Sequence, residues 1–226
     1  MTIRLRANSL NLHDIETKFG LQYADDEQFF REWIDDLPEL TDGEKQALNK
    51  LKAGYLNNAK YSMLEDTVKM VVLGPLLYLA DFYLAPFHIE AEKSVELITE
   101  DEGIIVRGNI DVLLLTENFW VVAIETKSQQ YSIDTGLPQL LFYMLSNPVA
   151  ELPTFGLLTN GRNFQFVKVM EGEKREYALS YDLSINRNDD FYYVFRVLKR
   201  LGYLVSNNGR SEERRVGKEC RSRWSP

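Results

Sequence analysis

Two carboxylates and one lysine stand at a spacing suited to phosphate chemistry in the middle of this 226-residue sequence. Asp111 lies in one apolar run, and Glu125 and Lys127 lie at the end of the next. If the two runs pair as antiparallel strands across residues 116–119, Asp111 lies opposite Ile124 or Glu125. Side chains at i and i+2 share a face of a strand, so Lys127 stands beside Glu125. The spacing therefore predicts two acids and one amine at the end of a hydrophobic hairpin.

These groups suit the hydrolysis of phosphate esters with a divalent cation. Mg²⁺ prefers oxygen ligands, commonly one or two carboxylates with waters and substrate phosphate. Such an ion activates a bound water and neutralises the charge that develops on a phosphoryl group. The alternative is a solvated strand end with a surface ion pair, which contributes only about 0.2–1 kcal/mol.

The sequence contains its own control for the short motif. Ile-Glu-Thr-Lys occurs at residues 15–18 as well as at 124–127. The first copy follows polar residues, runs into Phe19-Gly20 and has no acid upstream on a partnering strand. An isolated Glu-x-Lys is therefore a weak indicator. The second copy gains weight from its apolar strand, the acid on the preceding strand and a helical glutamate further upstream.

Hydrophobic periodicity predicts the elements that position these groups. We expect the first sixty residues to be helical, with helices over residues 26–36 and from a capping box at Thr41 to Glu44. A third helix opens at Ser62 and continues until Gly74-Pro75 interrupts it. The expected elements after residue 86 are strands 87–97, 104–115 and 119–124, a helix from Pro138, strands 155–159 and 164–169 joined through Asn160-Gly161, and a helix over 189–204.

This order predicts an α/β fold with a mixed central sheet flanked by helices. We divide the chain into an N-terminal helical extension, residues 1–60, and a core domain with its C-terminal helix, residues 61–205. The composition, 45% hydrophobic and 27% charged, is typical of globular proteins. No apolar run approaches the ~20 residues of a membrane span. The N-terminus lacks the apolar segment of a secretory signal, so we expect a cytoplasmic protein with no membrane partner.

The last residues, 210–226, differ abruptly from the rest of the chain. They resemble the conceptual translation of a sequencing adaptor, and we expect them not to belong to the natural protein, whose true C-terminus then lies elsewhere. The alternative is a basic, disordered tail that binds nucleic acid. Leaving out the six basic and three acidic residues of this segment takes the net charge from −8 to −11. The segment also holds the only cysteine, Cys220, so thiol chemistry and cysteine-zinc sites are excluded elsewhere.

Three motifs together resemble the PD-(D/E)XK nuclease superfamily, and within it the N-terminal nuclease domain of type I restriction enzyme R subunits. They are Arg-Gly-x-Ile-Asp at 107–111, Glu-x-Lys at 125–127 and Thr-Asn-Gly at 159–161. The resemblance covers roughly residues 62–169 and implies a restriction-endonuclease-like core in the order αβββαβ. The proline that gives the family its name is replaced by Ile110, as it is in many relatives.

The resemblance implies a role for each residue of the hairpin. Asp111 and Glu125 would bind Mg²⁺, or Mn²⁺ in its place, and the backbone carbonyl of Thr126 would add a third ligand. Lys127 would orient the attacking water or stabilise the transition state.

Further candidates lie on the two helices that flank the hairpin. The family carries an acid on the helix before the sheet, which points to Glu65 as a catalytic residue and metal ligand, with Asp66 as the substitute. Ser62 and Glu65 could equally form a capping box. Gln139 and Tyr143 resemble the Q-x-x-x-Y motif of RecB-like nucleases, where they would bind DNA or orient the site. Their i, i+4 spacing fits an ordinary helix flank as well.

The leading hypothesis is a Mg²⁺-dependent DNA endonuclease of a restriction system. The acidic composition argues against strong general binding of DNA, so contacts must be local or come from a partner. The candidate contacts are Arg107, Lys127, Arg162 and Lys168. Type I enzymes imply helicase, specificity and methylation subunits as partners, although this sequence contains no phosphate-binding loop of a motor.

Two alternatives stay open at this point. One is a catalytically inactive nuclease-fold scaffold or nucleic-acid-binding module, and the other is a nuclease that prefers RNA or DNA ends. Three polar residues of the first strand, His88, Glu90 and Glu92, share one face. We expect them to be exposed to solvent and not to act as ligands.

Overall fold

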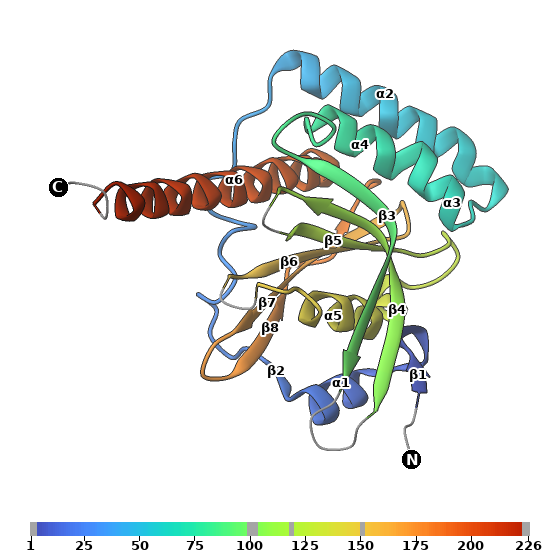
Figure 1. Ribbon diagram of the computed structural model, residues 1–226. Helices are drawn as coiled ribbons and strands as arrows, with labels where there is room; N and C mark the ends of the chain where they lie inside the picture. The colour runs from blue at the N-terminus through green and yellow to red at the C-terminus, as the bar shows by residue number, and fades with distance from the viewer. Residues whose placement is uncertain (1–3, 99–103, 118–119, 150–151, 223–226) are drawn as a thin grey trace.

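A mixed β-sheet runs through the protein, with helices on both of its faces (Figure 1). The computed structural model describes residues 4–98, 104–117, 120–149 and 152–222, with side chains up to residue 206. The strands are β1 Arg4–Arg6, β2 Leu21–Tyr23, β3 His88–Ile98, β4 Ile105–Leu115, β5 Trp120–Thr126, β6 Thr154–Thr159, β7 Asn163–Glu171, β8 Arg175–Leu179 and β9 Leu183–Ser184. The α-helices are α1 Leu12–Phe19, α2 Asp42–Asn58, α3 Glu65–Val68, α4 Gly74–Leu79, α5 Leu137–Leu145 and α6 Asp190–Ser222.

The sheet order is β1-β4-β5-β6-β7-β8-β2, with β3 paired to β4 and β9 paired to β7. β3, β4 and β5 form the predicted antiparallel meander. The chain then crosses through α5 and returns as β6, parallel to β5. β6 and β7 form the predicted hairpin, and Gly161 in its turn has a φ of +79°. The prediction of an α/β fold with a mixed central sheet and flanking helices is confirmed.

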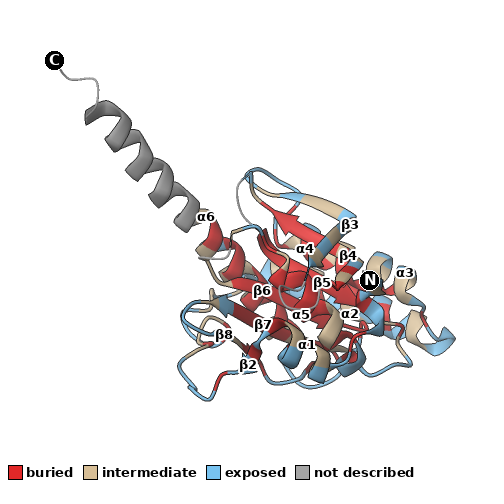
Figure 2. Ribbon diagram, turned by 60° about the horizontal axis from the view of Figure 1, so that its bottom comes forward, coloured by how far each residue is buried: buried red, intermediate tan, exposed pale blue. Residues whose placement is uncertain are grey.

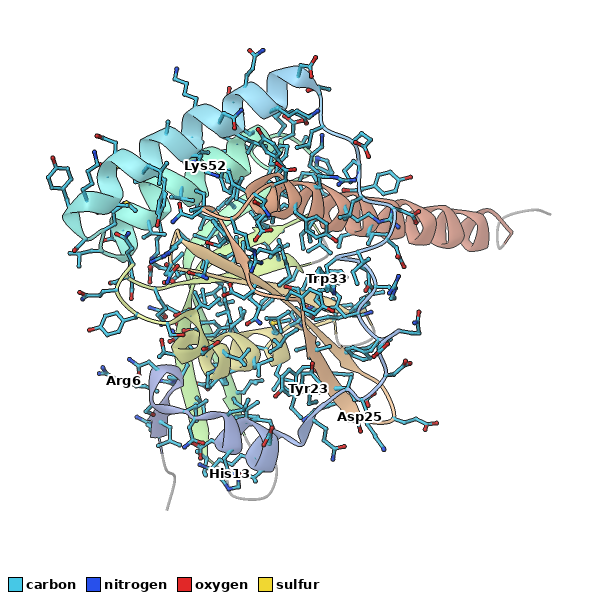
Figure 3. The ribbon with its side chains drawn as sticks, turned by 180° about the vertical axis from the view of Figure 1, so that it is seen from behind. Arg6, His13, Tyr23, Asp25, Trp33 and Lys52 are labelled. Atoms are coloured by element: carbon cyan, nitrogen blue, oxygen red, sulfur yellow. The ribbon has the colours of Figure 1, made fainter. Side chains whose placement is uncertain are left out.

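Each face of the sheet has its own hydrophobic core. α2, α4 and α6 contribute Leu48, Leu76 and Phe195 to one of them, and α1 and α5 contribute Ile15 and Leu140 to the other. The central strands β5 and β6 are buried along their whole length. Figure 2 shows buried residues concentrated where the strands lie between these helices. Figure 3 shows Lys52 on α2 and His13 on α1 at opposite ends of the molecule.

We expected the first sixty residues to be helical, but they also contain two strands. The prediction of a helix at Thr41 is confirmed, with reciprocal bonds between Thr41 and Glu44. However, β1 pairs in parallel with β4, and β2 pairs in parallel with β8. Residues 26–36 form turns instead of a helix. Their aromatic side chains Phe30 and Trp33 are buried, so tertiary packing overrides the local helical pattern.

The third helix starts later and ends later than predicted. Ser62 has a φ of 54° and makes no cap, and α3 begins at Glu65 with Leu64 as its uncapped N-cap. Pro75 does not end the helix, because residues Lys69–Leu73 form a π-helical turn that leads directly into α4. Proline cannot donate a backbone hydrogen bond and its ring crowds the carbonyl four residues earlier. The wider π-helical turn accommodates it there, and such turns are frequent at functional sites.

β3 and β4 change the face that they bury halfway along their length. Ile110 packs in the core beside α5, whereas Val112 of the same parity packs in the opposite core. On β3, Ile89 packs against one core and Val95 against the other. A regular strand keeps all residues of one parity on one face. The change falls at Asp111, which therefore lies at an irregular point of the sheet.

The final helix begins as predicted but extends further. α6 runs from Asp190 to Ser222, whereas periodicity predicted an end at Leu204. The foreign origin of residues 210–226 stays a prediction, and residues 223–226 lie outside the described part of the chain. In the described residues, no helix combines the length and the apolar character needed to cross a bilayer.

We predict that Gly108→Ala destabilises the protein. A Cβ at residue 108 would lie 2.6 Å from the Ala7 Cβ and 2.7 Å from Tyr143 Cε1. Such overpacking costs about 1–3 kcal/mol of unfolding free energy. Gly54→Ala is the matched control, because nothing lies within 4 Å of a Cβ there and alanine favours the interior of α2 by up to ~1 kcal/mol. Urea unfolding of both variants tests this, and equal stabilities would contradict it.

Candidate active site

The β4–β5 register brings Asp111 and Glu125 together. Val112 pairs with Ile124, so the next pair in the same register is Asp111 and Glu125. The Asp111 Oδ2 accepts hydrogen bonds from the Thr126 backbone N–H at 2.7 Å and from the Thr126 Oγ1 at 2.6 Å. The predicted pairing of the two strand ends is therefore confirmed, and the negative charge of Asp111 acts on Glu125.

Asp111 lies beside an interruption in the sheet. β3 lies along one edge of β4, and the other edge pairs with β1 at residues 105–107 and with β5 at residues 112–115. Between these two ladders, residues 108–110 pair with no strand of the described part of the chain on that edge, and Asp111 lies where the β5 ladder begins. Tyr143 of α5 fills part of the gap, since its hydroxyl is hydrogen bonded to the Asn109 backbone. At the end of this gap the Asp111 carboxylate accepts a hydrogen bond from Lys69 of the adjoining π-helical turn.

Glu125 is a buried acid, with 2% of its surface exposed. Its Oε1 accepts a hydrogen bond from the Lys127 Nζ at 2.6 Å, whereas its Oε2 is buried with no hydrogen-bond partner. Burial, together with the negative charges of Asp111 and Glu65, raises the pKa of Glu125 to about 8 although Lys127 opposes this. A neutral or metal-bound carboxyl group is therefore favoured at this position over a free carboxylate.

The predicted pair on α5 completes a hydrogen-bonded chain with Lys127. The Lys127 Nζ donates to the Gln139 Oε1 at 3.3 Å, and the Gln139 Nε2 donates to the Tyr143 hydroxyl at 2.7 Å. Burial and the charges of Glu125 and Asp111 raise the pKa of Tyr143, so its hydroxyl stays protonated. Gly136 lets this layer approach, because a Cβ there would lie 3.0 Å from Lys127 Cε and 3.1 Å from Glu125 Cγ.

Glu65 lies near the acid pair without a direct bond to it. It is the first residue of α3 and is half-buried. Its charge contributes to the raised pKa of Glu125. Since Ser62 makes no side-chain cap, the capping-box interpretation of Glu65 is wrong. Asp66, the substitute candidate, is exposed and lies 3.9 Å from Lys69.

Lys69 belongs to the cluster, although the sequence did not predict it. Its Nζ donates to the Asp111 Oδ1 at 3.1 Å and to the Glu92 Oε1 at 3.3 Å. Burial disfavours the charged form, but the facing acids outweigh it and raise the pKa of Lys69. A signal for this residue existed, because Lys69 follows Glu65 by four positions and therefore shares its side of the helix.

Other predicted residues lie outside the cluster. Arg107 forms an ion pair with Glu96 on β3. Among the described residues, no hydrogen bond joins Arg107 to Asp111. The prediction that Lys168 contacts DNA is wrong. Lys168 is only 8% exposed, and its ammonium donates hydrogen bonds to the Phe29 carbonyl and to Glu32. Arg162 is exposed in the β6–β7 turn.

The three polar residues of the first strand have different environments. His88 is exposed, as expected. Glu90 is half-buried and pairs with Lys93 at 2.7 Å. Glu92 is exposed and also accepts a hydrogen bond from Lys69. It lies opposite Asp111 in the β3–β4 ladder, and its backbone there has a φ of 54°.

The Thr159-Asn160-Gly161 turn holds the end of β5 in place. The Lys127 N–H donates to the Thr159 carbonyl at 2.8 Å, and the Asn160 side-chain amide donates to the Tyr131 carbonyl at 2.8 Å. The Thr159 Oγ1 accepts from the Gly161 N–H at 3.0 Å. The motif therefore acts as a support for the loop that carries Lys127.

The donor set fits a hard divalent cation at Asp111 and Glu125. The unpartnered Oε2 of Glu125 is an oxygen donor, and a bound cation would offset the burial and the neighbouring negative charge that raise the pKa of this group. Thr126, whose carbonyl is the third predicted ligand, lies between Glu125 and Lys127 in the sequence. Among the described residues, no three His, Cys, Asp or Glu side chains gather as a potential metal-binding group, so Glu65 does not complete a set.

Comparison with known proteins does not assign this chain to a family. No protein-family model matches the sequence, and no curated protein shows significant similarity to it. The resemblance drawn from the three motifs stays a prediction, and the geometry of the site carries the functional proposal below.

We predict that Glu125 makes stability decrease as pH rises. Its pKa is about 8 in the folded protein against 4.5 ordinarily, so between these values the folded state holds a proton that the unfolded chain has released. The contribution of Glu125 to the free energy of unfolding is complete below pH 4.5 and is lost as pH rises through about 8. The free energy of unfolding falls by at most ~1.4 kcal/mol per pH unit in this range. Glu125→Gln should remove this slope in urea unfolding without added metal.

The control for this measurement is Glu16→Gln in the first copy of the tetrapeptide, where Glu16 is exposed on α1. That variant should keep the pH dependence of the unchanged protein. Parallel pH profiles for Glu125→Gln and the unchanged protein would show that Glu125 is not held in this environment.

Proposed function

We propose that the protein is a Mg²⁺-dependent endonuclease that hydrolyses DNA phosphodiester bonds. The observation that carries this proposal is the buried Glu125, with one oxygen on Lys127 and the other without a partner beside Asp111. The order helix, three-stranded meander, crossover helix, strand supports a restriction-endonuclease-like core. The motif resemblance adds a restriction system as the setting, with helicase, specificity and methylation subunits as partners.

The ion would be held by the carboxylates of Asp111 and Glu125 and by the Thr126 carbonyl, with Glu65 close enough to add negative charge. When bound, Mg²⁺ or Mn²⁺ would lower the pKa of a water and neutralise phosphoryl charge. Thr126 keeps Asp111 in one orientation through two short hydrogen bonds. Orientation of this kind matters because misplaced catalytic groups lose much of their effect.

Lys127 is the residue proposed to act on the reacting groups. Its ammonium is fixed between Glu125 and Gln139, and a fixed positive charge stabilises negative charge that develops in the transition state. Gln139 and Tyr143 are positioning residues, since they hold Lys127 from the side of α5. Of the cations predicted to contact DNA, Lys127 lies at the site and Arg162 is exposed in the β6–β7 turn, so contacts with DNA would be few, as expected for an acidic protein.

A second candidate function has one observation in its favour. Both oxygens of Asp111 already accept hydrogen bonds, one from Lys69 and the other from Thr126. This arrangement suits a nuclease-fold module that binds nucleic acid without cleaving it. A measurement of DNA cleavage distinguishes the two functions.

We predict Mg²⁺-dependent nicking of supercoiled plasmid DNA that is lost on addition of a chelator. Asp111→Ala and Lys127→Ala should each lower the rate by roughly 10²–10³-fold, as expected for groups that act on transition-state charge. Lys18→Ala, in the first copy of the tetrapeptide, should leave the rate unchanged. Gel analysis of the nicked product checks this. Nicking that survives both site variants would exclude the proposed site, and none by the unchanged protein would favour the binding module.

Lys69→Met is predicted to bind divalent cations more tightly. Lys69 places a positive charge on Asp111, and its repulsion of a bound cation should weaken affinity by roughly tenfold at this range. Isothermal titration with Ca²⁺ or Mg²⁺ measures this without turnover. Lys18→Met is the control, because Lys18 makes a similar ion pair with Asp14 on α1. Equal or weaker binding by Lys69→Met would contradict the electrostatic account.

A further inference from the structure

One glutamine joins the loop that follows β5, residues 127–131, to the chain just before α3. The Gln129 backbone N–H donates to the Met63 carbonyl at 3.0 Å, and the Met63 N–H donates to the Gln129 Oε1 at 3.2 Å. Both backbone groups of Met63 are therefore bonded to a single residue that lies 66 positions later in the chain. The contact ties the strand that ends in the candidate site to the helix that begins beside it (Figure 1).

The chain before α3 has little local support of its own. Ser62 has a φ of 54°, in the left-handed region that residues other than glycine rarely adopt. Leu64 is the N-cap of α3 but makes no side-chain cap, and α3 has only four residues. Short helices are unstable without tertiary contacts. The position of this segment therefore depends on such contacts, and the two hydrogen bonds with Gln129 are among them.

The side chain of Gln129 also reaches α2. Its Nε2 donates to the Tyr55 hydroxyl at 3.4 Å. Tyr55 is buried, and burial raises the pKa of its hydroxyl, so this group stays neutral. Buried polar groups need hydrogen-bond partners, and Gln129 supplies one. A single side chain therefore connects α2, the start of α3 and the loop that carries Lys127.

The Thr159-Asn160-Gly161 turn supports the same region by packing. Gly161 allows α3 to approach the turn, because a Cβ at residue 161 would lie 3.2 Å from the Val68 Cγ1. The turn also bonds the loop through Lys127 and Tyr131. The loop is therefore held by the turn, and α3 rests on the turn while Gln129 bonds the segment before it.

This anchored segment leads directly into the charges that face the acid pair. Glu65 follows Met63 by two positions, and its negative charge acts on Glu125. Lys69 is fixed by its own bond to Asp111. Among the described residues, no hydrogen bond or ion pair joins Glu65 to the acid pair, so its position depends on the segment before it. Because Coulomb interactions weaken with distance, that position determines how strongly its charge acts on the site.

We propose that Gln129 is a positioning residue, which holds Glu65 close enough to the acid pair for its negative charge to strengthen the binding of a divalent cation. The inference deepens the proposed function and rests on it. Glu65 then raises the affinity for Mg²⁺ through its charge, without being a direct ligand. Gln129 acts through the start of α3 and not on the reacting groups.

Isothermal titration with Mg²⁺ tests the proposal without turnover. Gln129→Ala should weaken Mg²⁺ binding by roughly three- to tenfold, because a charge that moves away attracts the cation less. Glu65→Gln should weaken it by a similar factor. Adding Gln129→Ala to Glu65→Gln should cause no further loss, since both changes act through one charge. Gln130→Ala, at the exposed neighbouring residue, should bind Mg²⁺ as the unchanged protein does.

Plasmid nicking provides a second readout. For Gln129→Ala, the Mg²⁺ concentration that gives half the maximal rate should rise by the same factor as the dissociation constant. The rate at saturating Mg²⁺ should not change, because the groups that act on the phosphate keep their places. A general structural defect would lower the saturated rate as well.

Two outcomes would overturn the proposal. One is Mg²⁺ binding by Gln129→Ala at full affinity. The other is a loss of affinity as large in the Glu65→Gln background as in the unchanged protein, with circular dichroism confirming the fold, which would make Gln129 merely structural. Failure of the proposed function is distinguishable. Mg²⁺ binding that depends on Gln129 but brings no nicking removes only the catalytic function, whereas nicking whose Mg²⁺ requirement ignores Gln129→Ala removes only the positioning role.

Discussion

The burial of one carboxylate, Glu125, is the constraint on which the site depends. An acid with 2% exposure is stable only if it is protonated, paired or bound to a cation. The surrounding structure supplies part of this through the ammonium of Lys127, which Gln139 and Tyr143 hold from α5. It leaves the second oxygen of Glu125 without a partner. Glu125 lies at the end of β5, a central strand that is buried along its whole length. The sheet therefore fixes the position of the unpartnered carboxyl oxygen.

The rest of the site follows from an interruption in the sheet. β1 and β5 share one edge of β4 but do not meet, and β3 and β4 change their buried face at the same level. Asp111 lies at this point, where Thr126 holds one of its oxygens and Lys69 the other. Lys69 reaches it from a π-helical turn that accommodates Pro75. This local distortion of the helix therefore places a lysine against the Asp111 carboxylate.

Local patterns in the sequence predicted the parts of the fold that local physics determines. The meander, the helix after Pro138 and the hairpin through Asn160-Gly161 follow from alternation, helical periodicity and turn chemistry. The constant index sum of antiparallel strands placed Asp111 opposite Ile124 or Glu125, and the observed pairing of Val112 with Ile124 selects Glu125. Long-range features were not predictable in this way. β1 and β2 are three residues each and exist because distant strands pair with them, and the contact between Lys69 and Asp111 needs the tertiary fold. Lys168 appeared available because its partners, Phe29 and Glu32, are distant in sequence.

The most direct test of the account is the titration of the Glu125 side-chain carboxyl by carbon-detected NMR, first without metal and then with Mg²⁺. The account predicts a pKa of about 8 without metal and a clear decrease on addition of Mg²⁺, because the cation favours the ionised form. A pKa near the ordinary 4.5 that does not respond to Mg²⁺ would contradict both the burial of the charge and its role as a ligand.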